Sequence, residues 1–288
     1  MDDTIRGRLT RDGIRIHEDS DFEGMRRAGR LAAEILDGVA DLVFPGQTTG
    51  EIDRHVAERV EAAGATSATI GYKGYRHATC ISVNHVVCHG IPGEKRLRDG
   101  DILNVDVTVV VEGWYGDSSR MYVAGKLARK AERLIDVTHD ALMCGIEAVR
   151  PGNSFADIGV AIQQHVEAHR MSVVRDFCGH GLGRVFHAPP NVLHYAPFVR
   201  DASGAKVHAT TGRAFDDRSS VLEEGMFFTI EPMVNLGRPE TKVLDDDWTA
   251  VTRDRSLSAQ FEHSVGVTAT GAEIFTPSPA GRFHPTWA

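Results

Sequence analysis

The sequence has little of what marks membrane, secreted or nucleic-acid-binding proteins. Its longest apolar runs, such as residues 105–111, are interrupted by polar residues, so none approaches the roughly 20 residues that a membrane helix needs. The net charge is −8, which argues against nucleic acid as the main partner. The first residues, Met1-Asp2-Asp3, lack the basic start and apolar stretch of a signal peptide. We therefore expect a cytoplasmic protein that binds neither membranes nor nucleic acid.

Cysteine is also scarce. The 288 residues include four cysteines, none of them in a CxxC pair: Cys80, Cys88, Cys144 and Cys178. This scatter predicts reduced, partly buried thiols and argues against a disulfide framework or a zinc knuckle.

What the sequence does have is an internal repeat. The stretch LVFPGQT at 42–48 resembles AVRPGNS at 148–154, and each lies between two amphipathic helical patterns. Pro-Gly ends the first helix of each pair, and Thr48 with Glu51, or Ser154 with Asp157, predicts the N-cap of the second. The first helix of each pair has apolar residues at helical spacing: Ala28, Leu31, Ile35 and Val39, then Leu134, Val137, Ala141 and Ile146.

Strand-like sequence follows each helix pair, CISVNHVVCHG and DILNVDVTVVV in the first half, FFTIEPMV and FEHSVGVTA in the second. This order predicts an α+β fold with pseudo-twofold duplicated halves and a curved antiparallel sheet covered by helices. We expect an N-terminal tail at 1–20 and one catalytic domain over 21–280, with halves of about 21–125 and 126–280. Residues 196–222 lack periodicity and predict a surface insertion, either mobile or folded into a small hairpin.

Two aspartates lie where strands are predicted. Alternation from Asn104 to Thr108 places Asp106 on the polar face of a valine-rich strand. If Glu112-Gly113 is a turn, Asp117 lies across the hairpin from Asp106. Asp117 alone is better explained as a turn residue, but an unpaired buried carboxylate at Asp106 is costly. Two facing carboxylates repel each other unless a cation or a proton lies between them.

Three further candidates lie in the second half. His180 is flanked by glycines in CGHGLGR, Glu231 lies in the apolar run FFTIEPM, and Glu262 enters a valine-rich strand in AQFEHSVGV. Each alone has an ordinary structural explanation. Together, several buried acids without arginine partners nearby in sequence indicate a cation site. Four carboxylates and one imidazole suit Mn²⁺, Fe²⁺ or Co²⁺, and can hold two ions that activate water for hydrolysis.

From about residue 21 to 275 the chain resembles the type I methionine aminopeptidases, which have the pita-bread fold. The matching motifs are GYKGYRHATCISVNHVVCHGIPG, GDILNVDVTVVVEGWYGDSSRMYVAGK, VVRDFCGHGLGRVFHAPPNVLHY, GMFFTIEPM and DRSLSAQFEHSVGV. The resemblance implies a cytoplasmic enzyme that removes the initiator methionine from nascent proteins and peptides with a small second residue. It also implies two divalent ions (Co, Mn, Fe or Zn), held by Asp106, Asp117, His180, Glu231 and Glu262.

The resemblance implies further roles. Asp117 and Glu262 would bridge the two ions, and Glu231 would also shuttle a proton from the attacking water. His89 would contact the scissile amide, and His187 the substrate carbonyl. The methionine side chain would lie among five residues: Tyr72, Tyr75, Cys80, Phe186 and Trp248. Thr69 occupies the position where many bacterial relatives have a cysteine that lines the pocket. Backbone carbonyls near Asn84, Val86 and Ser258 would hold a monovalent cation.

Two alternatives remain from the sequence. Proline-specific pita-bread peptidases share the five ligands but carry a sizeable N-terminal domain, for which the position of Asp106 leaves no room. Non-catalytic pita-bread binding proteins have lost ligands, whereas all five are present here. The expected partners are nascent polypeptides at the ribosome and free peptides, and the expected state is a monomer.

Overall fold

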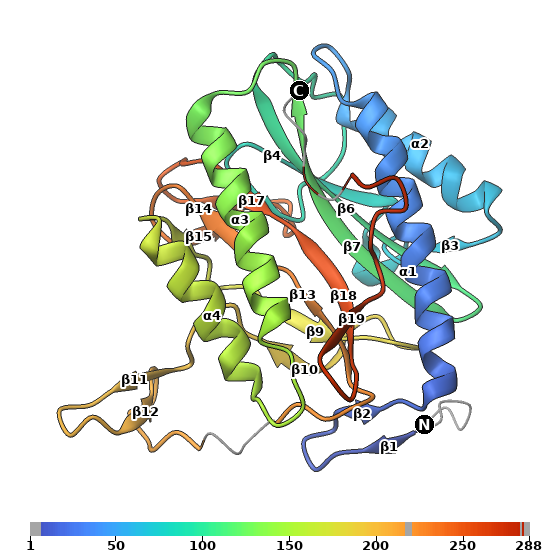
Figure 1. The fold of residues 1–288 in the computed structure, drawn as a ribbon. Coiled ribbons are helices and arrows are strands. Elements are labelled where there is room, and N and C mark those ends of the chain that lie inside the picture. The colour runs from blue at the N-terminus through green and yellow to red at the C-terminus, as the bar shows by residue number, and fades with distance from the viewer. Residues whose placement is uncertain (1–6, 217–220, 283, 285–288) are drawn as a thin grey trace.

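The computed structural model describes residues 7–216, 221–282 and 284. Its centre is a curved, nine-stranded sheet in which every pairing is antiparallel (Figure 1). The main path runs β10 (Ala188–Val192), β9 (Gly179–Gly181), β13 (Phe227–Ile230), β18 (Glu262–Val267), β7 (Trp114–Ala124), β6 (Asp101–Val111) and β3 (Thr66–Ser67). Off this path, β19 (Ala272–Ile274) pairs with β18, and β4 (Thr79–Val83) pairs with β6.

Short strands make two further sheets of three strands each. One consists of β17 (Ser258–Gln260), β14 (Met233–Asn235) and β8 (Ser172–Val173). The other consists of β15 (Thr241–Val243), β16 (Ala250–Thr252) and β5 (Val86–Cys88). Single turns of 3₁₀ helix occur at Ala40–Leu42 and Tyr72–Gly74.

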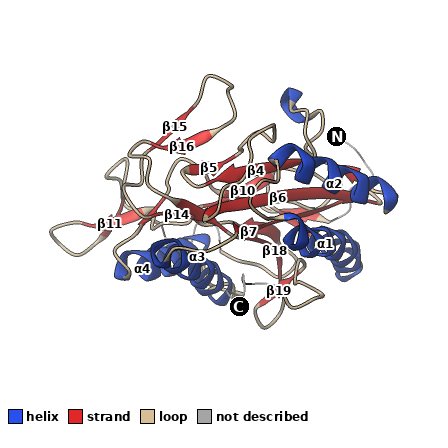
Figure 2. Ribbon diagram, turned by 90° about the horizontal axis from the view of Figure 1, so that it is seen from above, coloured by secondary structure: helices blue, strands red, loops and turns tan. Residues whose placement is uncertain are grey.

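The four helices form two pairs, as the repeat predicts. They are α1 (Asp19–Val39) with α2 (Thr49–Ala62), and α3 (Arg129–Glu147) with α4 (Phe155–Ala168). Figure 2 shows α1, α3 and α4 on the same side of the sheet. The capping boxes predicted at Thr48 with Glu51 and at Ser154 with Asp157 are both present. No helix of the described chain is long and apolar enough to cross a bilayer.

Each half has its own core. The helix pair α1–α2 buries Leu36 and Ile52 against Val105 of the first hairpin. The pair α3–α4 buries Leu134 and Ile162 in a second cluster. The halves meet where β18 pairs with β7, and α1 covers β6 and β7 as α3 covers the strands of the second half. This arrangement confirms the predicted α+β architecture of two related halves.

The β6–β7 hairpin corrects one detail of the sequence analysis. Its two-residue loop is Glu112-Gly113, both with positive φ, which suits a tight hairpin turn. With Val111 opposite Trp114, the residue opposite Asp106 is Ser119, and the residue opposite Asp117 is Thr108. The two aspartates are therefore diagonal neighbours on one face rather than a directly opposed pair.

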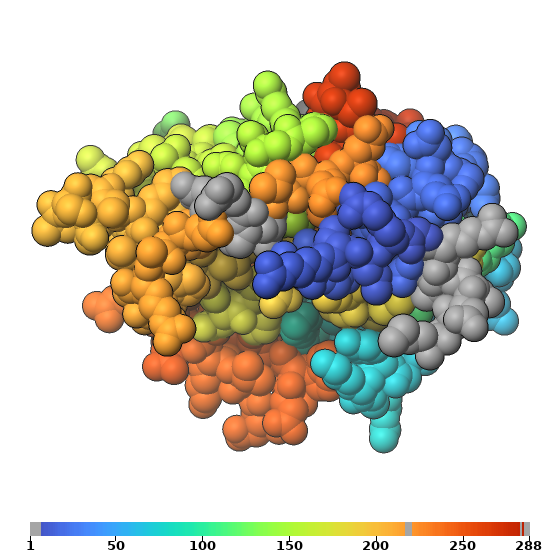
Figure 3. All heavy atoms as spheres, turned by 90° about the horizontal axis from the view of Figure 1, so that it is seen from below, coloured from blue at the N-terminus to red at the C-terminus, as the bar shows by residue number. Residues whose placement is uncertain are grey.

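The described part of the predicted tail has structure. Strands β1 (Arg8–Leu9) and β2 (Arg15–Ile16) form a hairpin, and Ile14 in its turn is buried in the core of the second half. Before α1 begins at Asp19, this N-terminal segment runs across the face of the molecule that Figure 3 shows. The boundary at residue 20 stays a prediction.

The insertion at 196–222 contains a hairpin, one of the two alternatives predicted. Strands β11 (Phe198–Arg200) and β12 (Lys206–His208) pair with each other and project from the body of the protein (Figures 1 and 3). Phe198 contacts the ring of Phe215 at 5.1 Å, so the hairpin has a small apolar contact of its own. Residues 217–220 lie outside the described residues.

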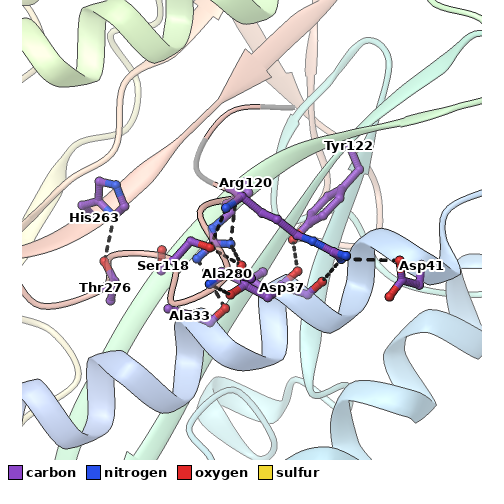
Figure 4. A network of polar contacts seen from close by, with 12 residues as sticks. Ala33, Asp37, Asp41, Ser118, Arg120, Tyr122, His263, Thr276 and Ala280 are labelled. Carbon is purple, nitrogen blue, oxygen red and sulfur yellow. Dashed lines mark hydrogen bonds and ion pairs between the residues drawn. The ribbon is translucent and has the colours of Figure 1, made fainter. Parts of the chain in front are cut away.

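A polar network fastens the C-terminal segment to α1 (Figure 4). Asp37, on α1, accepts hydrogen bonds from Arg120 of β7 and from the Ser278 hydroxyl, and the Ala280 amide donates to it at 3.1 Å. Arg120 is 3% exposed and Asp37 is 8% exposed, so this ion pair is buried. The network ties α1 and β7 of the first half to the C-terminal segment.

Candidate active site

A cavity of about 630 Å³ opens over the strands where the two halves meet. Tyrosine, phenylalanine and tryptophan side chains line it together with carboxylates and imidazoles. Every residue that the sequence analysis assigned to divalent-ion binding, catalysis or substrate contact lines this cavity: Tyr72, Tyr75, Cys80, His89, Asp106, Asp117, His180, Phe186, His187, Glu231, Trp248 and Glu262. Tertiary structure thus brings together residues that lie up to 190 positions apart in the chain.

The acidic part of the cavity has the geometry of a cation site. Asp117 of β7, His180 of β9 and Glu262 of β18 each offer a ligand atom, and these atoms lie within 4.8 Å of one another. The Nε2 atom of His180 is 3.6 Å from Asp117 Oδ2 and 3.8 Å from Glu231 Oε1. Asp106 lines the same cavity from β6. The five side chains therefore come from four strands and one connecting segment.

The raised pKa values of these carboxylates also indicate a site for cations. Burial raises the pKa of Asp106 well above its usual value, and the neighbouring Asp117 raises it further. Burial likewise raises the pKa of Glu231 and Glu262, and the other acids of the cluster add to the effect. Within the described residues, no lysine or arginine forms an ion pair with these carboxylates. Bound divalent ions would replace this repulsion by attraction, so the donor set fits them.

The ring of His180 is oriented for this role. Its Nδ1 atom lies 3.1 Å from the carbonyl oxygen of Gly181, which accepts the Nδ1 proton. Nε2 then carries the lone pair and faces the carboxylates. The backbone N–H of His180 donates to Thr229 Oγ1 at 3.0 Å, which fixes the strand that presents the ring.

Glu231 lies in the break between β13 and β14, whereas the sequence analysis placed it in a continuous strand-like run. The following proline cannot donate to a sheet, which is a physical reason for the break. Two neighbours that the sequence analysis missed orient Glu231. Thr229 Oγ1 donates to Glu231 Oε1 at 2.8 Å, and the Glu231 amide donates to His194 Nε2 at 3.1 Å.

His194 is fully buried, and burial lowers its pKa to about 3. It is therefore neutral at physiological pH, and its Nε2 atom is an acceptor. A histidine between apolar and aromatic residues in VLHY was the available sequence signal, but its partner lies 37 positions away. Thr229 carried a similar signal, because it is the one polar residue in FFTI.

His89 and His187 flank the carboxylate cluster. The ring of His187 lies 4.1 Å from that of His180 and is stacked on Tyr72 at 5.1 Å. Burial, together with the charges of His180 and Lys73, lowers the pKa of His187 to about 3. Burial and Lys73 also lower the pKa of His89. Both imidazoles are thus neutral at pH 7, and each can donate one hydrogen bond to a substrate.

One wall of the cavity is apolar and aromatic. Tyr72 contacts Phe186 at 4.9 Å, and Tyr75 contacts Trp248 at 4.8 Å. Cys80 is buried beneath them, and burial raises the pKa of its thiol, which stays neutral. Such a surface suits a flexible thioether side chain. Thr69 also lines the cavity, with its hydroxyl donating to the His77 carbonyl at 2.8 Å.

The remaining cysteines are free thiols, as expected, and Cys178 lies on the cavity wall. The segments of the expected monovalent-cation site are adjacent, since the Ser258 amide donates to the Asn84 carbonyl at 2.9 Å. Val86 is paired with Val251 in β5–β16. The Ser258 hydroxyl is buried without a partner among the described residues. The monovalent cation itself stays a prediction.

Comparison with known proteins agrees with this geometry. Residues 23–269 match the model of metallopeptidase family M24. The chain is 50% identical over 275 residues to methionine aminopeptidase of Rickettsia prowazekii, covering 95% of this chain and 99% of the relative. It is 48% identical over 265 residues to methionine aminopeptidase of Escherichia coli strain K12, covering 91% and 94%.

Comparison with solved structures also finds methionine aminopeptidases. The crystal structure of the Rickettsia prowazekii enzyme superposes with a TM-score of 0.82 at 51% identity, covering 91% of this chain and 99% of that one. The prolidase of Pyrococcus furiosus has a TM-score of 0.70 at 20% identity, covering 91% of this chain and 65% of its own, a likeness of fold alone. The chain therefore belongs to metallopeptidase family M24, and within that family to the methionine aminopeptidases. Membership of this family implies a divalent metal centre.

Proposed function

We propose that this protein removes methionine from the N-terminus of peptides and nascent proteins whose second residue is small. The observation that carries the proposal is the convergence of Asp117, His180 and Glu262 beside an aromatic, thioether-compatible cavity wall. Identities of 48–50% to methionine aminopeptidases over more than nine-tenths of the chain support it.

Two divalent ions, of Co, Mn, Fe or Zn, would be held by five side chains. Asp117 and Glu262 would contact both ions, Asp106 would complete the shell of one, and His180 and Glu231 that of the other. When bound, such ions act as Lewis acids and lower the pKa of water at the site. The burial of the carboxylates supports this assignment, because a site screened from bulk water strengthens their attraction to cations.

Three side chains would then act on the substrate. Glu231, oriented by Thr229 and His194, would take the proton of the attacking water and pass it to the leaving amine. Neutral His187 would donate a hydrogen bond to the substrate carbonyl, where negative charge develops in the transition state. Neutral His89 would contact the scissile amide.

The methionine side chain would lie against Tyr72, Tyr75, Cys80, Phe186 and Trp248. Sulfur makes favourable contacts with aromatic edges, and the tilted Tyr75–Trp248 pair offers such edges. The small second residue follows from the resemblance of the chain to its family. We further propose that the enzyme acts as a monomer in the cytoplasm on chains leaving the ribosome, and that a monovalent cation binds near Asn84, Val86 and Ser258.

A peptide panel tests the proposal. Purified protein with added Mn²⁺ or Co²⁺ should release methionine from Met-Ala and Met-Gly peptides but not from Met-Lys peptides. Chelation, or Asp106→Ala, should abolish the release. Preferential cleavage of X-Pro peptides would overturn the assignment in favour of a proline-specific peptidase, whose fold is shared at 20% identity. Binding of peptides without cleavage under every metal would favour a non-catalytic binding protein.

A further inference from the structure

A short loop presents Lys73, the one lysine among the described residues that line the cavity. Residues 71–74 fold back on themselves, with the Gly71 amide donating to the Tyr75 carbonyl at 2.7 Å and the Tyr75 amide to the Tyr72 carbonyl at 2.9 Å. Lys73 adopts a left-handed conformation (φ 46°, ψ 31°), which is uncommon for a residue with a side chain. Gly71 and Gly74 on either side also have positive φ, which lets the loop close. The loop is therefore a defined element rather than a loose connection.

Lys73 is held beside the catalytic groups without an acidic partner. Its ammonium lies 5.3 Å from the centre of the Tyr72 ring, and Tyr72 in turn stacks on His187. Within the described residues Lys73 forms no ion pair, although five carboxylates line the same cavity. Asp176, the fifth of these, accepts a hydrogen bond from Thr241 Oγ1 at 2.6 Å. Lys73 is exposed and lines the cavity, so a ligand in the cavity can reach its side chain.

The charge of Lys73 reaches both imidazoles that would contact the substrate. Besides burial, Lys73 is the side chain that lowers the pKa of His89, and it also lowers the pKa of His187 after burial and His180. Lys73, His89 and His187 also line the same cavity, so the scissile amide that the two histidines would contact lies within reach of the lysine's charge. With the methionine side chain against the aromatic wall, the peptide beyond the scissile amide would extend toward the exposed ammonium.

We propose that Lys73 is a specificity-determining residue that favours peptides with a carboxylate just beyond the second residue. That carboxylate is the side chain of an acidic third residue or the C-terminus of a short peptide. The inference rests on the proposed function. An exposed lysine–carboxylate pair contributes little, so the preference is about threefold and weakens as salt screens the charges.

Amidated peptides isolate the side-chain contribution. We expect kcat/KM for Met-Ala-Asp-amide to exceed that for Met-Ala-Asn-amide about threefold, and that for Met-Ala-Lys-amide to fall below both. Lys73→Gln should bring the Asp/Asn ratio to about one, and Lys73→Glu should invert it. A ratio that shrinks in 0.5 M NaCl would support a charge interaction. Comparing Met-Ala-Gly acid with its amide tests the C-terminal carboxylate in the same way.

Arg76→Gln is the matched control, since Arg76 is exposed on the same segment but does not line the cavity. It should leave the Asp/Asn ratio as in the wild type. An unchanged ratio in Lys73→Gln, or an equal loss of activity on all three peptides, would overturn the inference and leave Lys73 a structural residue. Failure to cleave even Met-Ala-Asn-amide would instead contradict the proposed function.

Discussion

The Nε2 atom of His180, from the second half of the chain, lies 3.6 Å from Oδ2 of Asp117, from the first. This contact crosses the seam at which β18 pairs with β7, with Glu262 opposite Ser119. The candidate metal centre therefore exists only when both halves are folded and paired. Loss of either half, or of the seam, should remove ion binding altogether.

Asp106→Asn should change stability in opposite directions with and without metal. In chelator the variant should be at least as stable as the wild type, because one of several mutually repelling buried carboxylates is gone. With Mn²⁺ the wild type should gain several degrees in its unfolding midpoint, since an ion that binds only the native state stabilises it. The variant should gain less. Thermal unfolding with and without Mn²⁺ measures both effects, with Glu58→Gln on the exposed face of α2 as control. Equal metal-induced gains in the unfolding midpoint of all three proteins would show that Asp106 is not a metal ligand.

His187→Ala should slow catalysis without weakening metal binding. If its ring donates to the substrate carbonyl, the loss should lower kcat on a Met-Ala peptide about 100-fold, the lower end of the range for one oxyanion donor. The metal-induced rise in the unfolding midpoint should match that of the wild type. His208→Ala, on the projecting hairpin, should have wild-type kinetics. A variant of His187 that loses the metal-induced shift would show that the ring acts on the metal centre instead.

Asp37→Ala should destabilise the protein strongly. It leaves Arg120 buried without its carboxylate and also removes acceptors for Ser278 and Ala280 (Figure 4). Breaking a buried pair in this way costs about 3–5 kcal/mol of unfolding free energy. Asp41→Ala removes a 3.4 Å contact between Arg282 and an exposed aspartate, and should cost less than about 1 kcal/mol. Urea unfolding distinguishes the two. A small effect at Asp37 would mean that water reaches Arg120 and replaces its partner.

His17 should make stability depend on pH. The ring is buried, stacked on Phe227 at 4.2 Å, with Asp21 and Arg15 as its charged neighbours. Burial lowers its pKa from 6.5 to about 4, so the folded state keeps it neutral while the unfolded chain binds a proton below pH 6.5. Its contribution is thus present above pH 6.5 and is lost as pH falls toward 4.

The measurement is the free energy of unfolding in urea at pH 7.5 and pH 5, with chelator present. Between these values the wild type should lose about 2 kcal/mol more than His17→Phe, because the phenylalanine keeps the stacking but cannot titrate. Identical losses in the two proteins would show that His17 is not the group responsible.

Much of the secondary structure could be predicted from the sequence because its signals are local. The spacing of Leu134 and Ala141, and the pairing of Ser154 with Asp157, lie within a few residues of one another and describe a helix and its cap. The turn Glu112-Gly113 is equally local, and it sets the register of the whole β6–β7 hairpin. Counting outward from that turn places Ser119 opposite Asp106, so Asp106 and Asp117 face each other diagonally across the hairpin rather than directly.

The sequence by itself thus determined the two helix pairs, the strands, the duplicated plan and, through its resemblance to a family, which residues to expect in the site. Only the tertiary structure decided that Thr229 and His194 orient Glu231, that Glu231 lies in a break between strands, and that Lys73 lines the same cavity as His89 and His187. The physical reason is distance along the chain. His194 is 37 positions from Glu231, and only the folded chain brings the two into contact. Thr229 is two positions from Glu231, but its hydroxyl reaches the carboxylate where β13 ends between them, before the next strand begins.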